Sequence, residues 1–230
     1  MGVAYNPNIV TDGLVLCLDA ANKRSYPGAG TTWTDRSANG NNGTLTNGPT
    51  FDSANGGSIV FDGTNDYVTT TKNNLDINNL SICCWVFFTS IPATYTTITN
   101  KETSNLNRNW WIGLDPNGYF TFLRSRNGAD TGISSSVTAV SNNWYFFCCT
   151  NNSTPIYSIY LDGVLINQNN YGSGTLSVAG SNNYIGSYAS GGGSLYNLPG
   201  QIANILYYNR TLSADEVRRN YNATKGRFNV

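Results

Sequence analysis

The sequence predicts an all-β fold, a sandwich or a barrel, on three observations. Segments rich in aromatic and β-branched residues recur along most of the chain, separated by Gly, Asn, Asp and Pro. The 230 residues include 34 Asn and 24 Gly, which favour turns and disfavour helix interiors. Only one segment, near the C-terminal end, carries a helix start signal. Many short strands at this spacing indicate a sandwich or barrel rather than alternating strands and helices.

The strand-like segments can be placed in chain order. The expected strands are residues 13–19, 57–62, 66–71, 80–89, 95–101, 109–115, 118–124, 143–151, 155–161, 164–168, 183–187 and 201–209. Residues 20–50 form the longest stretch without such a segment, and we expect an irregular connection there. A long connection of this kind is either functional or a plain link, and the sequence leaves both interpretations open.

Two connections carry turn signals that predict hairpins. Asp162 and Gly163 separate "IYSIYL" from "VLINQ", and this pair suits the positive φ angles of a type I′ turn. The segment "PNG" at 116–118 joins "WWIGLD" to "YFTFLR" in a similar way.

One helix is expected close to the C-terminal end. Ser213 and Glu216 have the spacing of a capping box, in which each side chain bonds the backbone amide of the other residue. Val217 and Tyr221 fall on one face of the helix that follows. Gly226 is placed to close it.

Charge and hydropathy exclude several classes of function. With 13 basic and 13 acidic side chains, the chain has no net charge to attract nucleic acid or an anionic membrane. Its apolar runs, such as "ICCWVFF", are far shorter than the ~20 residues that a membrane helix needs. The opening residues lack the basic and apolar regions of a secretory signal. We therefore expect no nucleic-acid partner, no membrane insertion and no secretory signal.

The residue types also argue against hydrolytic chemistry. The chain has no His, which removes Ser-His-Asp and Cys-His nucleophilic sets and His metal sites. Of its two Glu, Glu102 has no acidic neighbour in sequence, and Glu216 is explained by the helix cap, so the paired carboxylates of a glycosidase are not expected. The five Cys form two vicinal pairs and a single residue, at spacings that do not suit a zinc site. The expected function is binding without catalysis.

Several segments, taken in order, resemble the laminin-G-like domains of the concanavalin A-like lectin and glucanase superfamily. They include "GLVLCLDA", "GGSIVFDGTNDYV", "LSICCWVFF", "NNWYFFCCTNN", "IYLDGVLI", "YIGSY" and "GQIANILYYNRTLSADEVRRNYNATKGRF". The resemblance covers most of the chain. It implies one domain over residues 1–230, an antiparallel two-sheet jelly roll with one short C-terminal helix. The alternating Glu and Asp strand of the superfamily's glucanases has no counterpart in this sequence, so their activity does not carry over.

Many members of this superfamily hold a structural calcium ion. Asp62, Asn65 and Asp66 in "DGTND" offer hard oxygen ligands, although calcium takes six to eight. The alternative is a plain turn in which both aspartates bond their own backbone. The turn is the favoured interpretation, and no other cofactor is expected.

A glycan site would need aromatic faces beside polar side chains. The adjacent Trp110 and Trp111 must point to opposite faces of their strand, one towards the core and one outward. The sequence candidates for ligand binding are Trp110, Trp111, Tyr119, Tyr188 and Tyr196, with Tyr184, Tyr26 and Trp33 as further candidates. Most of the 29 aromatic residues are nevertheless expected in the core, and the alternative for each candidate is simple packing.

The same resemblance makes a structural prediction about two cysteines. Cys83 and Cys148 match the two positions that a disulfide joins in pentraxins, which implies that they face each other across neighbouring strands. Cys84 and Cys149 would then share the opposite face. A reduced, buried pair is the favoured state, with a disulfide as the alternative.

Within this family, the sequence particularly resembles the laminin-G-like virion proteins of tailed phages that infect marine bacteria. The opening "YNPNIVTDGLVLCLDA" and the ending "NYNATKGRF" carry this likeness. It implies a phage structural protein, a capsid decoration or tail-fibre-type module, assembled in the host cytoplasm and located in the virion. Its partners would be other virion proteins, a host surface glycan and further copies of itself. The chain has no heptads or repeats, which favours the capsid surface. The alternative is a secreted or cell-surface carbohydrate-binding lectin.

Overall fold

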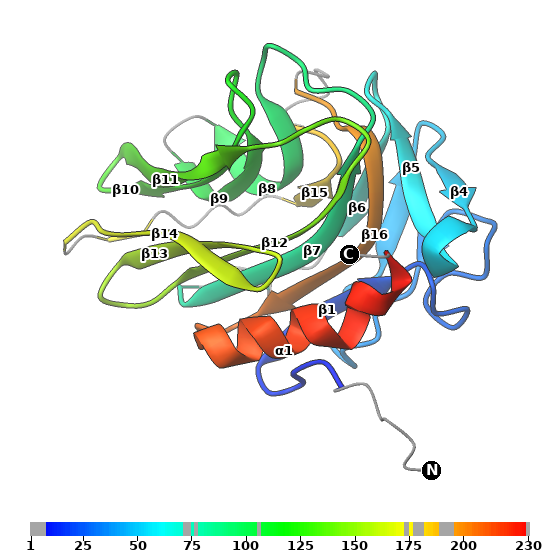
Figure 1. Cartoon of the computed structure of the whole chain (residues 1–230), viewed down its shortest axis with the longest axis horizontal. Helices are drawn as coiled ribbons and strands as arrows, with labels where there is room; N and C mark the ends of the chain where they lie inside the picture. The colour runs from blue at the N-terminus through cyan, green and yellow to red at the C-terminus, as the bar shows by residue number, and fades with distance from the viewer. Residues whose placement is uncertain are drawn as a thin grey trace.

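Strand pairing arranges the chain in two antiparallel sheets that stack as a sandwich, as Figure 1 shows. The computed structural model describes residues 8–70, 75, 78–104, 107–172, 175–176, 182–188 and 196–228, without the side chains of residues 103, 104 and 107. The predicted all-β jelly-roll fold with a short C-terminal helix is confirmed.

The first sheet, called sheet A, carries the helix on its outer face. Its strands are β1 (Leu14–Asp19), β4 (Thr50–Asp52), β5 (Ser58–Asp62), β7 (Leu80–Phe88), β12 (Trp144–Asn151), β13 (Ile156–Leu161), β14 (Val164–Asn170) and β16 (Pro199–Tyr208). They are ordered β14-β13-β12-β7-β16-β5-β4, and β1 pairs with β16. The helix α1 (Ala214–Thr224) lies beneath β1 and β16 in Figure 1.

The second sheet, called sheet B, lies above sheet A in Figure 1. Its strands are β2 (Thr32–Trp33), β3 (Gly43–Thr46), β6 (Tyr67–Thr70), β8 (Thr96–Ser104), β9 (Asn107–Leu114), β10 (Tyr119–Arg126), β11 (Ala129–Thr138) and β15 (Asn183–Ile185). They are ordered β11-β10-β9-β8-β15-β6-β3-β2. Two short 3₁₀ turns, Ala54–Gly56 and Lys225–Arg227, complete the described elements.

The central strands of sheet A, β7, β12 and β16, are buried on both faces, which explains the unbroken apolar run in β7. Ile82, Cys84 and Val86 point between the two sheets, whereas Cys83 and Trp85 point to the apolar layer between sheet A and α1. Strands that are buried on both faces need no alternation of apolar and polar residues. The apolar character of β7 therefore reflects a sheet covered on one side by its partner and on the other by the helix.

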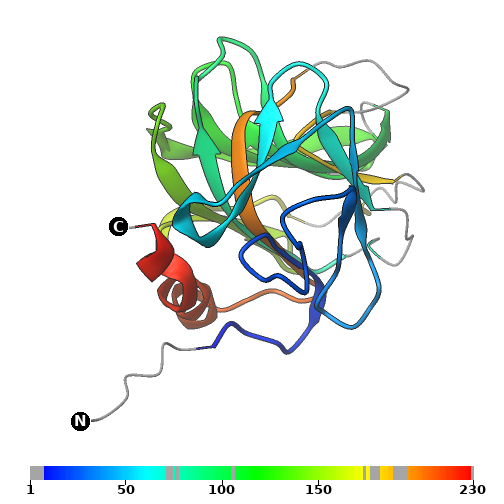
Figure 2. The same cartoon turned by 90° about the vertical axis from the view of Figure 1, so that its right-hand side faces the viewer.

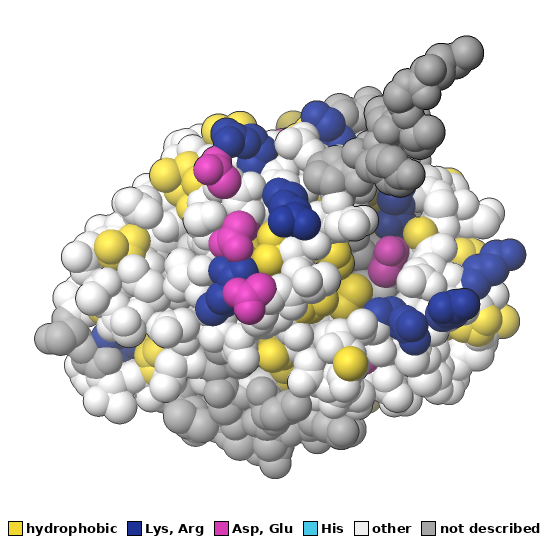
Figure 3. Space-filling view, turned by 90° about the horizontal axis from the view of Figure 1, so that it is seen from below, with side chains coloured by type: hydrophobic (Ala, Val, Ile, Leu, Met, Phe, Trp, Pro, Cys, Tyr) yellow, Lys and Arg dark blue, Asp and Glu magenta, His cyan; other side chains and the backbone are white. Residues whose placement is uncertain are grey.

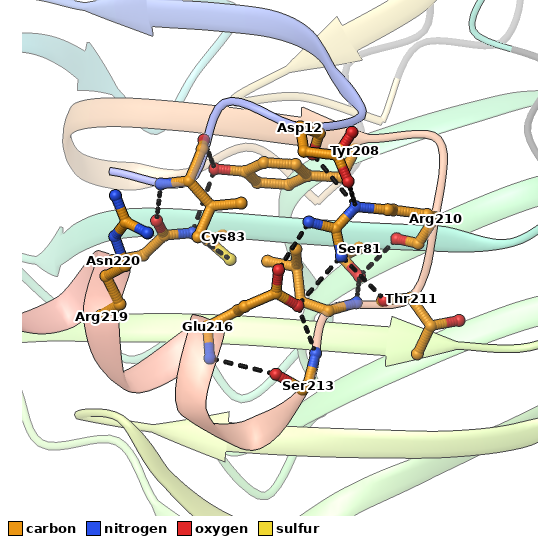
Figure 4. Close-up of polar contacts among 12 residues, drawn as sticks. Asp12, Ser81, Cys83, Tyr208, Arg210, Thr211, Ser213, Glu216, Arg219 and Asn220 are labelled. Atoms are coloured by element: carbon orange, nitrogen blue, oxygen red, sulfur yellow. Dashed lines mark hydrogen bonds and ion pairs between the residues drawn. The ribbon is translucent and has the colours of Figure 1, made fainter. Parts of the chain in front are cut away.

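Helix α1 begins at the predicted capping box. Ser213 Oγ accepts from the Glu216 amide at 3.3 Å, and Glu216 Oε2 accepts from the Ser213 amide at 2.9 Å. Arg210, which precedes the helix, donates to both Glu216 carboxylate oxygens, at 2.6 and 2.9 Å. Figure 4 shows these contacts together. They fix the start of the helix at the end of β16.

A buried asparagine joins α1 to the N-terminal segment. Asn220 Oδ1 accepts from the Val10 amide at 2.8 Å, and its Nδ2 donates to the Tyr208 hydroxyl at 3.0 Å. The Tyr208 hydroxyl donates to the Val10 carbonyl at 2.9 Å, closing the ring of contacts in Figure 4. Three segments that are distant in sequence are therefore connected by one satisfied polar group.

Both predicted hairpins are present. Asp162 and Gly163 have φ angles of 49° and 78° and connect β13 to β14, as a type I′ turn requires. Gly118, with a φ of 82°, closes the turn between β9 and β10.

The prediction was wrong in three places. Residues 20–50 were expected to be irregular, but β2, β3 and the start of β4 lie there, at the end of the sandwich that Figure 2 faces. Strand β11 was missed because its Ser-rich sequence lies at a sheet edge and buries few residues. Gly226 does not close the helix, since Lys225 caps it in the right-handed conformation and a 3₁₀ turn follows.

The structure places Cys83 opposite Cys148 in the pairing of β7 with β12. Their sulfur atoms are 2.7 Å apart, and both thiols are free and fully buried. Cys84 and Cys149 belong to the core between the sheets, on the other face of sheet A. Burial raises the pKa of the Cys84, Cys148 and Cys149 thiols well above the usual value, so they are unreactive as nucleophiles.

The face that carries α1 is mostly uncharged polar surface. Figure 3 shows acidic and basic side chains lying next to one another there, without a broad patch of either sign. Within the described residues, no helix combines the length and apolar character needed to cross a bilayer.

We expect Glu216→Gln to destabilise the protein in a pH-dependent way. Hydrogen bonding by Arg210 lowers the pKa of Glu216 from 4.5 to about 2. The contribution of the ionised Glu216 carboxylate to the free energy of unfolding is therefore fully present above pH 4.5 and is lost as the pH falls towards 2. The free energy of unfolding at pH 7 should fall by about 1 kcal/mol, as for loss of a helix cap.

Denaturant titrations of both forms at several pH values measure this difference, with Asp215→Asn as the control in the same helix turn. A stability difference between the unmodified protein and Glu216→Gln that stays constant down to pH 2 would contradict the lowered pKa of Glu216.

We expect oxidised and reduced glutathione, added while the unfolded protein refolds, to join Cys83 to Cys148, because both thiols are fully buried once the chain has folded. The pair is in register across two strands and can close without moving the backbone far. The product should lose about 2 Da and gain about 2–4 kcal/mol of stability, as closed loops of this kind do. Peptide mapping after alkylation of the unfolded protein identifies the linked residues, and a link through Cys17 or Cys84 instead would show the pairing to be wrong.

Candidate functional site

A pocket on the outer face of sheet B gathers aromatic and charged side chains. Its volume is about 490 Å³. The described residues that line it are Tyr95, Arg108, Trp111, Leu123, Asp130, Tyr188 and Tyr196. We call this the aromatic pocket. Its size and mixed lining are those of sites that bind small ligands.

Strand β9 supplies the base of the aromatic pocket. Trp110 and Ile112 point into the core between the sheets, so Trp111 points to the outer face. The Trp111 indole N–H donates to Thr97 Oγ1 on the neighbouring strand β8 at 2.9 Å, which fixes the ring. Trp111 is only 2% exposed and forms the floor of the pocket rather than its rim.

An irregularity in the pairing of β8 with β9 places the charged residues. Lys101 pairs with Trp110, but the next residue, Glu102, pairs with Arg108, so that Asn109 is an additional residue on β9. Such a bulge changes the direction of the side chains that follow it. As a result, Arg108 reaches the same face as Trp111 and lies beside Glu102.

Arg108 bonds two carboxylates. Its Nε donates to Glu102 Oε2, and its Nη1 donates to Asp130 Oδ2 at 2.7 Å. Ser125 Oγ donates to the other Asp130 oxygen at 2.7 Å and accepts from the Arg108 amide at 3.1 Å. Although burial opposes the charged form, Glu102 and Asp130 raise the pKa of Arg108 above its usual value. The formal charge of these three side chains is −1.

Three tyrosines form the walls. Tyr95 meets Trp111 edge-to-face at 5.6 Å and 85°, and meets Tyr196 at 5.6 Å and 75°. Tyr188 meets Tyr196 at 5.6 Å and 77°. Burial, followed by a hydrogen bond with Glu102, raises the pKa of Tyr188 to about 12, so its hydroxyl is neutral at physiological pH. The rings meet edge-to-face in succession and form an aromatic recess beside the neutral hydroxyl of Tyr188.

A second pocket adjoins the first. Its volume is about 600 Å³, and the described residues that line it are Asp62, Gly63, Thr64, Ser90, Pro92, Thr94, Tyr95, Tyr196, Asn197 and Pro199. We call this the loop pocket. Tyr95 and Tyr196 line both pockets.

Of the calcium candidates, Asp62 lines the loop pocket, and the carboxylates of Asp62 and Asp66 bond backbone amides. Asp62 Oδ1 accepts from the Thr64 and Asn65 amides at 2.7 and 3.2 Å, and Asp66 Oδ2 accepts from the Asp62 amide at 3.0 Å. These bonds form the predicted turn. No group of three acidic or Cys side chains suited to a metal is found among the described residues. Calcium binding by Asp62, Asn65 and Asp66 stays a prediction that the turn geometry does not support.

The structure places the other sequence candidates in three kinds of position: in the aromatic pocket, in the core, or outside both pockets. Trp111, Tyr188 and Tyr196 line the aromatic pocket. Trp110 was a wrong candidate, because its side chain is fully buried in the core. Tyr119 is half-buried at the start of β10 and is not among the described lining residues of either pocket.

Tyr26 and Trp33 are buried and hold the long connection in place, with the Tyr26 hydroxyl donating to the Gly30 carbonyl at 2.8 Å. Tyr184 contacts Tyr67 edge-to-face at 5.8 Å on sheet B.

Five residues of the site were not predicted as ligand-binding residues. Tyr95 precedes β8 in a loop, Leu123 lies on β10, and Glu102, Arg108 and Asp130 come from three other strands. No local motif marks them, because a strand bulge and cross-strand pairing bring them together.

Comparison with solved structures supports the fold assignment. Domain 4 of AbnA, an extracellular arabinanase from Geobacillus stearothermophilus solved with arabinotriose, has a TM-score of 0.69 at 15% identity, over 89% of this chain and 96% of that chain. The binding domain of Paraclostridial Mosquitocidal Protein 1 has a TM-score of 0.69 at 18% identity, over 92% of this chain and 52% of that one. A Trypanosoma rangeli sialidase in complex with sialic acid has a TM-score of 0.66 at 17% identity, over 93% of this chain and 33% of the sialidase chain.

The protein therefore spans about half of the toxin chain and a third of the sialidase chain. At these identities the likeness shows the fold alone. No significant relative is found among curated proteins.

The family itself is shown by the sequence match. The family model described as "Concanavalin A-like lectin/glucanases superfamily" matches residues 62–218, from the loop pocket to the first turns of α1. The chain, a two-sheet sandwich with a lectin-like fold, belongs to the concanavalin A-like lectin/glucanases superfamily.

Proposed function

We propose that this chain is a carbohydrate-binding module without catalytic activity, and that the aromatic pocket is its glycan site. The observation that supports this most strongly is the recess made by Trp111, Tyr95 and Tyr196 beside Arg108 and Asp130. Pyranose rings bind to aromatic surfaces through their C–H faces, while their hydroxyls need fixed polar partners. The solved structures of the same fold include complexes with arabinotriose and sialic acid, which is consistent with a glycan ligand.

The charged side chains of the pocket suit binding better than hydrolysis. A glycosidase needs one carboxyl group to donate a proton and a second to act as base or nucleophile. Here Glu102 and Asp130 both accept hydrogen bonds from the same guanidinium. The sequence has no His to serve as a general acid or base. Both carboxylates act in this proposal as anchors that hold Arg108 in place.

The test is glycan-array screening of the purified protein, followed by calorimetry with the strongest binder. We expect Tyr95→Ala and Tyr196→Ala each to weaken binding about fivefold, because an aromatic contact contributes on the order of 1 kcal/mol. Both rings are more than a third exposed, at 40% and 36%, so the variants should keep their thermal stability.

Tyr119→Ala removes a tyrosine of the same sheet outside the pocket and serves as the control. Equal losses in all three variants, or no glycan binding by the unmodified protein, would overturn the proposal.

We also propose that the module belongs to a tailed-phage virion, where it docks on capsid or tail proteins after assembly in the host cytoplasm. The likeness of its opening and ending segments to phage virion proteins supports this. Acidic and basic side chains alternate on the face that carries α1, without a broad patch of one sign in Figure 3, so this face does not repel a second copy of the chain. The alternative is a secreted or cell-surface lectin.

Sedimentation of particles distinguishes these two locations. A virion component should co-sediment with capsids or tails and appear as a distinct density in cryo-electron microscopy maps of the particle. Glycan binding with no particle association would support the secreted or cell-surface lectin instead.

A further inference from the structure

The two pockets share a wall made of two exposed side chains. Tyr95 and Tyr196 line the aromatic pocket on one side and the loop pocket on the other. Their rings meet edge-to-face at 5.6 Å and are 40% and 36% exposed. The volumes of about 490 and 600 Å³ each fall in the range of sites that hold a small ligand, about 300–1,000 Å³. A ligand longer than one ring can therefore cross these tyrosines and occupy both pockets.

The loop pocket supplies its own polar groups, in addition to those of the aromatic pocket. Ser90, Thr94 and Asn197 supply hydroxyl and amide groups, and Asp62 supplies a carboxylate. Hydrogen bonds from the Thr64 amide lower the pKa of Asp62, so this carboxylate is ionised at neutral pH. Such groups bond sugar hydroxyls, and a carboxylate can accept from two of them at once.

The charge of the groove disfavours acidic ligands. Arg108 is the one basic residue among the described residues that line the two pockets, and it already bonds Glu102 and Asp130. With Asp62 included, one positive and three negative side chains give a formal charge of −2. An acidic sugar would compete with Glu102 and Asp130 for the positive charge of Arg108 and would be repelled by Asp62.

We propose that the aromatic pocket and the loop pocket are two subsites of one groove that selects an uncharged oligosaccharide of two or more sugar rings, with Tyr95 and Tyr196 contacting the sugars at the junction. This inference rests on the proposed glycan-binding function and adds the length and the charge class of the ligand. Selection against acidic glycans follows from the net negative charge of the groove, since Glu102 and Asp130 already neutralise the charge of Arg108.

The experiment is calorimetry with the full chain at low ionic strength, where charge effects are least screened. The panel contains uncharged oligosaccharides of one to six rings and sialylated or uronate-containing oligosaccharides of matched length. We expect affinity to rise at least tenfold from one ring to three among the uncharged ligands. The acidic ligands should bind at least tenfold more weakly than uncharged ligands of the same length.

Three variants test the two parts of the inference. Ser90→Trp fills the loop pocket, so it should reduce the affinity for three rings to that for one ring and leave the single ring unaffected. Asp62→Asn and Asp130→Asn should each improve binding of acidic ligands about threefold or more. Asp215→Asn, which removes the same charge from an exposed position on α1, should leave every affinity unchanged.

The outcomes separate this inference from the proposed function. Preferred binding of acidic glycans that is lost in Tyr196→Ala would overturn the charge selection while the glycan site stands. An affinity that does not change with ligand length, or that Ser90→Trp leaves intact for long ligands, would overturn the two-subsite groove. No binding of any glycan would overturn the proposed function itself.

Discussion

The two-residue alternation of each strand is the constraint on which the rest of this structure depends. A strand that gives one side chain to the core between the sheets must turn the next one away from it. In β9 this rule separates two adjacent tryptophans, so that Trp110 fills the core and Trp111 becomes the floor of the aromatic pocket. In β7 and β12 the same alternation directs one set of side chains into the core between the sheets and the other set into the layer between sheet A and α1. Core and site are therefore two faces of the same strands.

The alternation of side chains is interrupted at one bulge in β9, and the positions of the charged side chains of the site depend on that bulge. The bulge at Asn109 turns Arg108 towards Glu102, and the two form a nearly buried ion pair. Breaking such a pair by removing one partner costs about 3–5 kcal/mol, so the arrangement is held firmly. Asp130, which is more exposed, joins the pair from the neighbouring strand pair of β10 and β11. The buried ion pair thus gives the pocket a fixed, slightly negative charge before any ligand arrives.

The sequence predicted the features that depend on local chemistry. Twelve strands, the Asp162-Gly163 turn and the capping box of Ser213 and Glu216 follow from residue types at fixed spacings. Strand β11 was missed because an edge strand buries little and needs no apolar alternation. The aromatic residues could be named as candidates, but Trp110 and Trp111 could not be distinguished without knowing which face was covered. Tyr95, Arg108 and Asp130 could not be found, because their meeting depends on register and on a bulge that leave no mark in the sequence.

The adjacent tryptophans also provide the most direct test of the central claim, that the outer face of β9 binds a glycan. Their indole N–H resonances can be followed by two-dimensional NMR while an uncharged oligosaccharide is added. The account predicts a saturable shift of the Trp111 signal, since its ring forms the pocket floor, while the signal of Trp110, its neighbour in the core, stays in place. A saturable shift confined to Trp85 or Trp144, which lie on the opposite side of the sandwich near α1, would contradict it.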